Sequence, residues 1–375
     1  MESRYYHVML LHALGDTIGF KNGAWEFNNY VSPDKLNTVD YVNELIYEFI
    51  ELGGVNGIDL TGWKISDDTI LHIAMARAML RYNGQRDKRF VNKIKKYLKH
   101  EADVMEKEKF DRVVGVTTRD SIGLFAHGQD ARDQPYNLLG GGNGAAMRTL
   151  CVGMCLYKEI QQDQMIWLSV VSSQLTHNNV HGYLGGFNAA LFVALAMRLV
   201  PVVQWPMILV GLLGTPALKQ YNLTNTDDEM IDQVMYSRYW KKYIDTKFDQ
   251  GVPIRNRAFA NPMHRIRYFH DNFHQSNGSS QIGGSGYLCM IMAYDALLDC
   301  DGKWEKLICY AMLHGGDSDT IGAVAGGLYG AVYGMGDVPP HMIKRIERKG
   351  ELKKLAKQMY NKYGADADGV VAVVA

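Results

Sequence analysis

The sequence predicts an all-α protein, and three observations support this fold class. Apolar residues recur at helical spacing in many segments, runs that alternate apolar and polar residues are few, and the β-branched residues are dispersed or terminal, as in residues 370–374. The chain has 375 residues, of which 47% are hydrophobic. It is therefore long enough to bury a large core.

The predicted helices can be followed along the chain. The first two each carry one apolar stripe, formed by Val8, Leu11, Leu14 and Ile18 in the one and by Ile70, Ile73, Ala76 and Leu80 in the other. The same spacing predicts helices over residues 165–175, 184–199, 287–298 and 304–313. Two more helices are expected to begin near Ala145 and Ile321.

Polar or glycine-rich connectors separate these helices at residues 53–62, 140–144 and 277–286. Apolar helices continue on both sides of each connector, so we expect one domain over residues 1–375. The most apolar stretch, residues 183–203, is interrupted by Asn188 and Arg198, which favours a core helix over a membrane span.

The charge balance argues against some classes of partner. The 40 Lys and Arg residues equal the 40 Asp and Glu residues in number, so the chain lacks the broad attraction typical of nucleic-acid and membrane binders. The basic run of residues 88–99 interleaves with Val91, Ile94 and Leu98, as expected for a solvated amphipathic helix. We expect no nucleic-acid or membrane partner, and an anionic substrate must be bound by local groups.

The five cysteines lack the paired spacing of a zinc site, and we expect buried thiols. This usage indicates a reducing compartment, and the N-terminal apolar run is not followed by a small-residue cleavage site. We therefore expect a cytoplasmic protein.

The clearest chemical signal is a pair of acidic segments, residues 66–69 (Ser-Asp-Asp-Thr) and 314–320 (His-Gly-Gly-Asp-Ser-Asp-Thr). Each segment opens a predicted helix. One Ser, Thr or Asp is enough to cap a helix N-terminus, where negative charge is also favoured. Four consecutive residues of these types, found twice, exceed what capping requires.

If the two segments meet in space, they bring together the carboxylates of Asp67, Asp68, Asp317 and Asp319. Like charges at close range repel and drive protonation, and two divalent cations would remove this conflict. Carboxylates, together with the hydroxyls of Ser66 and Thr320, suit magnesium, manganese or calcium rather than zinc. A two-metal site of this kind can polarise phosphate or sugar oxygens and activate a water, so a dinuclear phosphohydrolase is one possible function.

Together these segments resemble the ADP-ribosylhydrolases, a family of dinuclear magnesium enzymes. The resemblance runs in the family's order from about residue 5 to about residue 360, through residues 15–16, 66–69, 142–148 and 315–320. Within this family, the chain is most similar to the arginine-specific branch. This similarity is found at residues 22–27, 175–177, 182–185, 293–296 and 314–317. The resemblance implies a compact, all-helical bundle with two metals in a central cleft.

The resemblance also implies an activity and its residues. Two Mg²⁺ ions would be ligated by Ser66, Asp67, Asp68, Asp317, Asp319 and Thr320. The reaction would be hydrolysis of the N-glycosidic bond between ADP-ribose and arginine on mono-ADP-ribosylated proteins, releasing ADP-ribose and unmodified arginine. Asp67 and Asp68 are the candidates for proton transfer, as in glycoside hydrolysis generally. Glu26 would belong to a segment that closes on the metals.

Nine residues are expected by resemblance to bind ADP-ribose: Gly141, Gly142, Asn143, Gly144, His177, Gly284, Ser285, Gly286 and Tyr287. Backbone N–H groups of residues 141–144 would meet the diphosphate or distal ribose. Tyr287 or Tyr236 would offer an aromatic face for stacking. We interpret the small residues after Thr320 as close helix packing, because they lie beyond the helix N-terminus where anions bind, and Met147 as core filling.

Two departures from the arginine-specific pattern leave the linkage open. Phe20 stands where that branch commonly has Tyr, and Tyr287-Leu288 stands where it commonly has His-Asp. Two alternatives therefore remain: an O-linked hydrolase acting on serine-linked or O-acetyl-ADP-ribose, and an ADP-ribose-binding module without turnover. The complete set of six metal ligands favours an enzyme, and we expect it to be a monomer.

Overall fold

The computed structural model of the chain describes residues 1–27, 39–108, 112, 114–255, 257–274 and 281–364. The terminal β-branched run at 370–374 and the first part of the connector at 277–286 lie outside these ranges. Within them the architecture is helical, as predicted. A short antiparallel pair, β1 (Phe248–Asp249) and β2 (Val252–Pro253), flanks a turn in which Gln250 has a φ of 48° and Gly251 a φ of 82°.

The helices of the first half are α1 (Glu2–Phe20), α2 (Val39–Glu51), α3 (Gly54–Gly57), α4 (Asp67–Met79), α5 (Lys88–Met105), α6 (Val116–Leu124), α7 (Ala146–Cys155), α8 (Gln162–Gln174) and α9 (Val180–Met197). Those of the second half are α10 (Trp205–Leu213), α11 (Pro216–Lys219), α12 (Asp227–Lys247), α13 (Arg257–Ala260), α14 (Pro262–Phe273), α15 (Gly286–Asp299), α16 (Trp304–Ala311), α17 (Ser318–Tyr333), α18 (Pro340–Lys344) and α19 (Lys349–Met359). Short 3-10 segments are η1 (Lys21–Gly23), η3 (Phe125–His127), η4 (Ala131–Asp133), η5 (Glu159–Gln161) and η6 (Val202–Gln204), and a π-helical turn, η7 (Tyr360–Gly364), follows α19.

Each helix predicted from apolar spacing is found within a few residues of its expected bounds. The long helix α12 was not predicted, because its surface is mostly polar. Its buried face is formed by aromatic residues at helical spacing, Tyr236, Tyr239, Trp240 and Tyr243. Thr226 caps this helix by accepting from the backbone N–H of Glu229. Both signals are present in the sequence.

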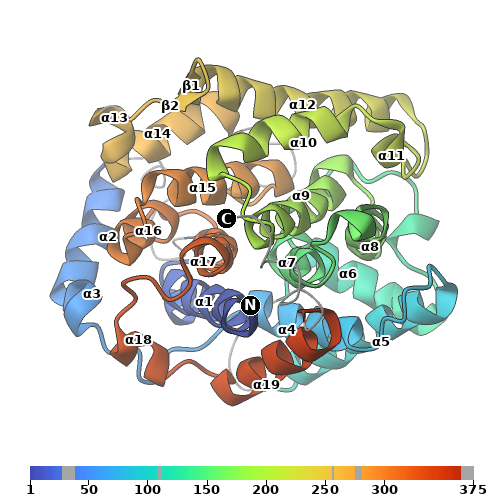
Figure 1. Cartoon of the computed structure of the whole chain (residues 1–375), viewed down its shortest axis with the longest axis horizontal. Helices are drawn as coiled ribbons and strands as arrows, with labels where there is room; N and C mark the ends of the chain where they lie inside the picture. The colour runs from blue at the N-terminus through green and yellow to red at the C-terminus, as the bar shows by residue number, and fades with distance from the viewer. Residues whose placement is uncertain (28–38, 109–111, 113, 256, 275–280, 365–375) are drawn as a thin grey trace, which may run out of the picture.

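Helices α1 and α17 lie side by side in the middle of the molecule (Figure 1). Their contact is made by glycines on both helices. A Cβ at Gly15 would overlap the Gly322 carbonyl, and a Cβ at Gly326 would overlap the carbonyl of Leu11. This confirms that the small residues after Thr320 serve close helix packing. The packing also sets the start of α17 beside the end of α1, and both carry acidic residues.

The long apolar helix α9 is a core helix. Among the helices described, it is long and apolar enough to cross a membrane, but 94% of its apolar window is buried inside the protein. The core-helix interpretation of this stretch is thus supported. All five cysteines are free thiols, and Cys309 alone among them is partly exposed.

Candidate active site

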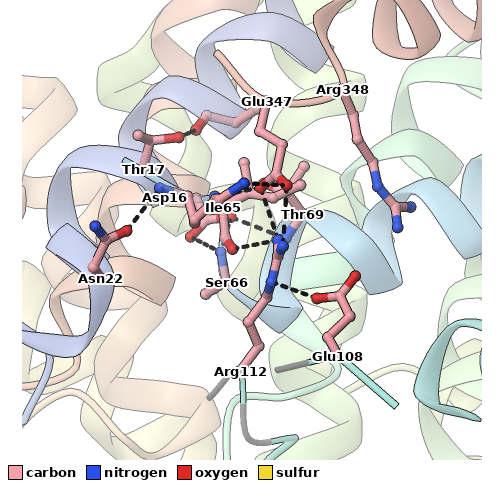
Figure 2. Close-up of polar contacts among 12 residues, drawn as sticks. Asp16, Thr17, Asn22, Ile65, Ser66, Thr69, Glu108, Arg112, Glu347 and Arg348 are labelled. Carbon is pink, nitrogen blue, oxygen red and sulfur yellow. Dashed lines mark hydrogen bonds and ion pairs between the residues drawn. The ribbon is translucent and has the colours of Figure 1, made fainter. Parts of the chain in front are cut away.

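The first acidic segment forms the start of α4. Ser66 is the N-cap residue, and its side-chain oxygen accepts a hydrogen bond from the backbone N–H of Asp68 at 3.1 Å. The Asp16 carboxylate of α1 accepts from the backbone N–H groups of Ser66 at 3.0 Å and Thr69 at 3.2 Å (Figure 2). A side chain from another helix thereby satisfies N–H groups that a helix start leaves without partners.

The second acidic segment enters α17 through a tight turn. Gly315 has a φ of 70°, and a Cβ there would overlap the ring of Tyr41. Asp317 occupies the N-cap position but makes no side-chain capping bond. Its Oδ2 instead accepts from Asn143 Nδ2 at 2.9 Å. Capping therefore does not account for Asp317, which is bound to the glycine-rich loop.

Both acidic segments line one cavity of about 330 Å³. Its acidic lining consists of Glu26, Asp67, Asp68, Asp317 and Asp319, next to Thr320. A second group of lining residues consists of Gly142, Asn143, Gly144, His177 and Gly284. The remainder is formed by Phe27, Met147 and residues 115–118 at the start of α6. The two segments meet in space, which is the condition on which the predicted metal site depends.

The two glycine-rich loops predicted to hold substrate lie next to each other. Gly142 forms an antiparallel bridge with Ser285, and the backbone N–H of Asn143 donates to Gly284 O at 3.1 Å. Because the Asn143 side chain also donates to Asp317, it joins this pair of loops to the acidic lining. The loops and the carboxylates therefore form one continuous site.

The acidic lining has strongly shifted pKa values. Burial, reinforced by the charge of Asp319, raises the pKa of Asp67 to about 8, although Asp67 is partly exposed at the cavity surface. Burial and the same neighbouring charge raise the pKa of Glu26 and the pKa of Asp68 well above their usual ranges. The carboxylates thus repel one another, and without cations some of them hold protons near neutral pH.

The whole chain can be compared with known proteins. The sequence profile of the ADP-ribosylglycohydrolase family matches residues 1–368. The chain is 32% identical to ADP-ribosylhydrolase ARH1 of Dictyostelium discoideum over 384 residues, which cover 94% of this chain and 92% of that protein. This chain belongs to the ADP-ribosylglycohydrolase family.

Two more comparisons agree with this family. Protein L444 of Acanthamoeba polyphaga mimivirus, named as a candidate ADP-ribosyl glycohydrolase, is 37% identical over 330 residues. That match covers 87% of this chain but 63% of the viral protein, so the chain spans less than two thirds of this relative. A solved structure described as an ADP-ribosylglycohydrolase-related protein complex covers 96% of this chain and 98% of its own, with a TM-score of 0.56 and 18% identity. At that identity it supports the fold alone.

The acidic part of the cavity lining fits hard divalent cations in its chemistry. Its side-chain donors are carboxylate and hydroxyl oxygens, and Asp68 Oδ2 is buried without a hydrogen-bond partner. Among the residues that the structure describes, no three carboxylate, imidazole or thiol groups already converge as a metal-binding cluster. Ser66, also predicted to be a ligand, does not line the cavity, and its side-chain oxygen caps α4.

His177 lies at the cavity and is neutral. Burial, reinforced by the cation of Arg148, lowers the pKa of His177 to about 3. Its Nδ1 lies 2.7 Å from Thr176 Oγ1, which also accepts from Arg148 Nη2 at 2.7 Å. Arg148 further donates to the carbonyl of Gly144. The guanidinium therefore contacts the glycine-rich loop directly and His177 through Thr176, and Arg148 itself does not line the cavity.

Four residues predicted to bind ADP-ribose do not line the described cavity: Gly141, Ser285, Gly286 and Tyr287. Tyr287 is nearly buried, its ring stacks on Tyr239 at 4.1 Å, and its hydroxyl donates to Phe273 O at 2.6 Å. Tyr236 is fully buried, with its hydroxyl donating to Leu184 O, and the prediction that it stacks on the ligand is wrong for this arrangement. These aromatic rings serve the core.

Some lining residues were not predicted from the sequence. Residues 115–118 open α6 without a side-chain cap and line the cavity together with Asp67 and Asp68 of α4. No local pattern marks this segment, because its place at the cavity depends on how α6 lies relative to α4. Met147 was interpreted as core filling, yet it also lines the cavity. Phe20 is buried and does not line the cavity. The absence of a tyrosine hydroxyl at this position therefore leaves the described lining unchanged.

Proposed function

We propose that this chain is a magnesium-dependent hydrolase of the N-glycosidic bond between ADP-ribose and arginine on mono-ADP-ribosylated proteins. The products would be ADP-ribose and the unmodified arginine side chain. One observation carries the proposal: five carboxylates and Thr320 share a single cavity with the two glycine-rich loops. The family supplies the class of bond.

Two Mg²⁺ ions would be held by Ser66, Asp67, Asp68, Asp317, Asp319 and Thr320. When bound, they would supply Lewis acidity to the ribose oxygens and to the attacking water. Five of these residues line the cavity, and the Ser66 oxygen retains a second lone pair beyond the one that accepts from Asp68 N–H.

Proton transfer is assigned to the α4 carboxylates. Asp67 lines the cavity and is partly exposed there, and Asp68 Oδ2 has no hydrogen-bond partner. Either carboxylate therefore has an oxygen that can accept the proton of the attacking water and return it to the departing nitrogen. Glu26 faces the same cavity and would close on the bound ribose.

The glycine-rich loops would bind the ADP-ribose by backbone contact. A Cβ at Gly144 would lie 2.6 Å from Thr118 Oγ1 and 3.1 Å from the His177 ring, so a side chain there would crowd the cavity lining. With glycine, phosphate oxygens can approach the loop backbone closely. This local arrangement meets the requirement that an anionic substrate be held without net positive charge on the chain.

The charge of the cavity favours an arginine linkage. Five carboxylates line it, and two divalent cations would leave one negative charge, with Glu26 as the carboxylate outside the ligand set. A guanidinium leaving group is cationic and would be attracted to this residual charge, whereas a serine hydroxyl would not. Phe20 and Tyr287, which depart from the arginine-specific pattern, lie outside the cavity lining.

The direct test uses defined substrates. Purified protein would be incubated with arginine-linked and serine-linked ADP-ribosyl peptides, with Mg²⁺ or with a chelator, and ADP-ribose release would be measured. We expect Mg²⁺-dependent release from the arginine peptide, and a loss of about 100-fold or more in Asp317→Asn. Asp103→Asn is the matched control, because the Asp103 side chain is 44% exposed, pairs with Lys99 and does not line the cavity.

Each alternative has its own outcome. Faster release from the serine peptide would favour an O-linked hydrolase. Tight ADP-ribose binding with no release from either peptide would favour a binding module. Cleavage of a generic phosphodiester would favour a phosphohydrolase and contradict the proposal.

A further inference from the structure

Ile65, the residue just before the α4 cap, has both of its backbone polar groups bound by one ion pair. Arg112 Nη1 donates to Ile65 O at 3.0 Å, and Glu347 Oε2 accepts from Ile65 N–H at 3.2 Å. The two side chains also pair with each other through two hydrogen bonds of 2.8 and 3.0 Å. Figure 2 shows Arg112 and Glu347 converging on Ile65 next to Asp16 and Ser66.

This ion pair lies where three distant segments meet. Glu347 lies between α18 and α19, Arg112 lies ahead of α6, and Ile65 leads directly into the acidic segment. Asp16 binds the next backbone N–H, that of Ser66, from the side of α1. The path of residues 65 and 66 is therefore held by three carboxylate or guanidinium groups, none of which lines the cavity.

The chain that follows Arg112 reaches the cavity within a few residues. Gly115 lines the cavity together with Asp67, and Ile65, which Arg112 contacts, lies two residues before Asp67. The ion pair is therefore close to the cavity along the chain without being part of its lining.

The geometry of the pair supports a positioning role. Arg112 and Glu347 form a two-pronged contact, which restricts direction as well as distance. The Arg112 side chain is 5% exposed and that of Glu347 22%, so solvent screens the pair little. Backbone groups without such partners would leave the α4 start free to shift, and the donors of a metal site need to be held closely in place.

We propose that Arg112 and Glu347 are positioning residues that fix the α4 start so that the Asp67 and Asp68 carboxylates stay at the cavity, where cations would bind. This inference rests on the proposed function, because it concerns the same site. Neither residue lines the cavity itself, so each would act through Ile65.

The test compares Glu347 with Glu351, a glutamate in the first turn of α19. Glu351 is the matched control, since its side chain is 29% exposed and pairs with Arg77 and Arg348 instead of Ile65. Glu347→Gln retains one oxygen that can accept from Ile65 N–H, and Glu347→Leu retains none. For each variant the melting temperature would be measured with and without Mg²⁺, the Mg²⁺ affinity by calorimetry, and kcat and KM on the arginine-linked peptide.

We expect Glu347→Leu to bind Mg²⁺ about tenfold more weakly than the wild type, with Glu347→Gln between them and Glu351→Leu unchanged. The increase in melting temperature caused by Mg²⁺ should shrink in the same order, and kcat should fall more than KM rises. A merely structural role would lower the melting temperature equally with and without Mg²⁺ and leave the increment intact.

One result would overturn the positioning role alone. In that result the wild type responds to Mg²⁺ and releases ADP-ribose, and Glu347→Leu lowers the melting temperature equally with and without Mg²⁺. Mg²⁺ binding without hydrolysis in the wild type would overturn the proposed function and leave the positioning role to be decided by the affinity series. A wild type that does not bind Mg²⁺ would overturn both.

Discussion

The carboxylate of Asp16 accepts hydrogen bonds from the backbone N–H of Ser66, through both of its oxygens at 3.0 and 3.1 Å. Oδ2 also accepts from Thr69 N–H at 3.2 Å. A buried carboxylate on α1 thereby holds the start of α4, where the acidic residues of the candidate site begin. This arrangement brings acidic groups together in the protein interior. Burial and the charge of Asp319 therefore raise the pKa of Asp16 to about 7.

Replacing Asp16 should separate its hydrogen-bonding role from its charge. Asp16→Ala leaves two buried N–H groups without an acceptor, at a cost of about 1–3 kcal/mol each in the free energy of unfolding. Asp16→Asn keeps one acceptor oxygen and removes the negative charge that repels Asp319. Without Mg²⁺, its loss in the free energy of unfolding should therefore be much smaller than that of Asp16→Ala. Urea denaturation in a chelator measures both variants. Equal losses would mean that the backbone contacts contribute little.

Magnesium should stabilise the folded protein, because it relieves the repulsion among the cavity carboxylates. At a free concentration 100 times the dissociation constant, binding to the folded state alone adds about 2.7 kcal/mol. The melting temperature in millimolar Mg²⁺, compared with that in a chelator, measures this gain. Asp317→Asn should reduce the gain and Asp103→Asn should not. An unchanged melting temperature in the wild type would contradict the metal site.

Without divalent cations, stability should fall as the pH rises. The folded-state pKa values of Asp16 and Asp67 are raised from 3.8 to about 7 and about 8. The folded protein therefore binds more protons than the unfolded chain above about pH 4, and each added pH step favours unfolding until about pH 8. Melting temperatures in a chelator at about pH 5.5, 7 and 8.5 test this slope. Asp67→Asn should flatten it, and a wild-type curve that rises with pH would contradict the assignment.

The acidic segments could be recognised from the sequence because their residues are dense and local. Asp67 and Asp68 are adjacent, and Asp317 and Asp319 flank one Ser, so each half of the site is visible in a short window. Asp16 could not be assigned a role in this way. Its partners lie about 50 positions away, and the bonds run to backbone groups that any residue type would supply.

The aromatic residues show the opposite problem. Tyr236 and Tyr287 have the chemistry that stacking on adenine requires, but the same rings fill a helical core equally well. Their burial depends on α12 packing over α9 and α15, a helix not predicted from its mostly polar surface. The start of α6 was missed for a related reason, since residues 115–118 and Asp67 line one cavity only in the folded chain.

The contact between α1 and α17 should tolerate no extra methyl group. A Cβ at Gly326 would overlap the Leu11 carbonyl, and because both atoms belong to packed helices, Gly326→Ala should lower the free energy of unfolding by about 3 kcal/mol. Gly211 in α10 is the matched control, since a Cβ there meets nothing within 4 Å. Gly211→Ala should stabilise the protein by up to about 1 kcal/mol through helix propensity. Equal effects in urea denaturation would contradict the close packing.

Arg148 is fully buried, and neutral oxygen atoms bind its guanidinium: the carbonyls of Gly144 and Ser172 and the hydroxyl of Thr176. Burial lowers its pKa to about 9, so it still carries its charge at neutral pH. Arg148→Met would leave these oxygens without a donor and release the glycine-rich loop. Because the loop would hold the diphosphate, we expect ADP-ribose affinity measured by calorimetry to fall at least tenfold, or about 1.4 kcal/mol.

The exposed Arg119→Met variant controls for the loss of positive charge near the cavity, since its side chain is 58% exposed. The Mg²⁺-induced rise in melting temperature should survive in Arg148→Met, because the guanidinium contacts the loop rather than the carboxylates. A variant that loses Mg²⁺ binding and ADP-ribose binding together would instead indicate that Arg148 supports the whole cavity, and the separation of loop and metal functions would be wrong.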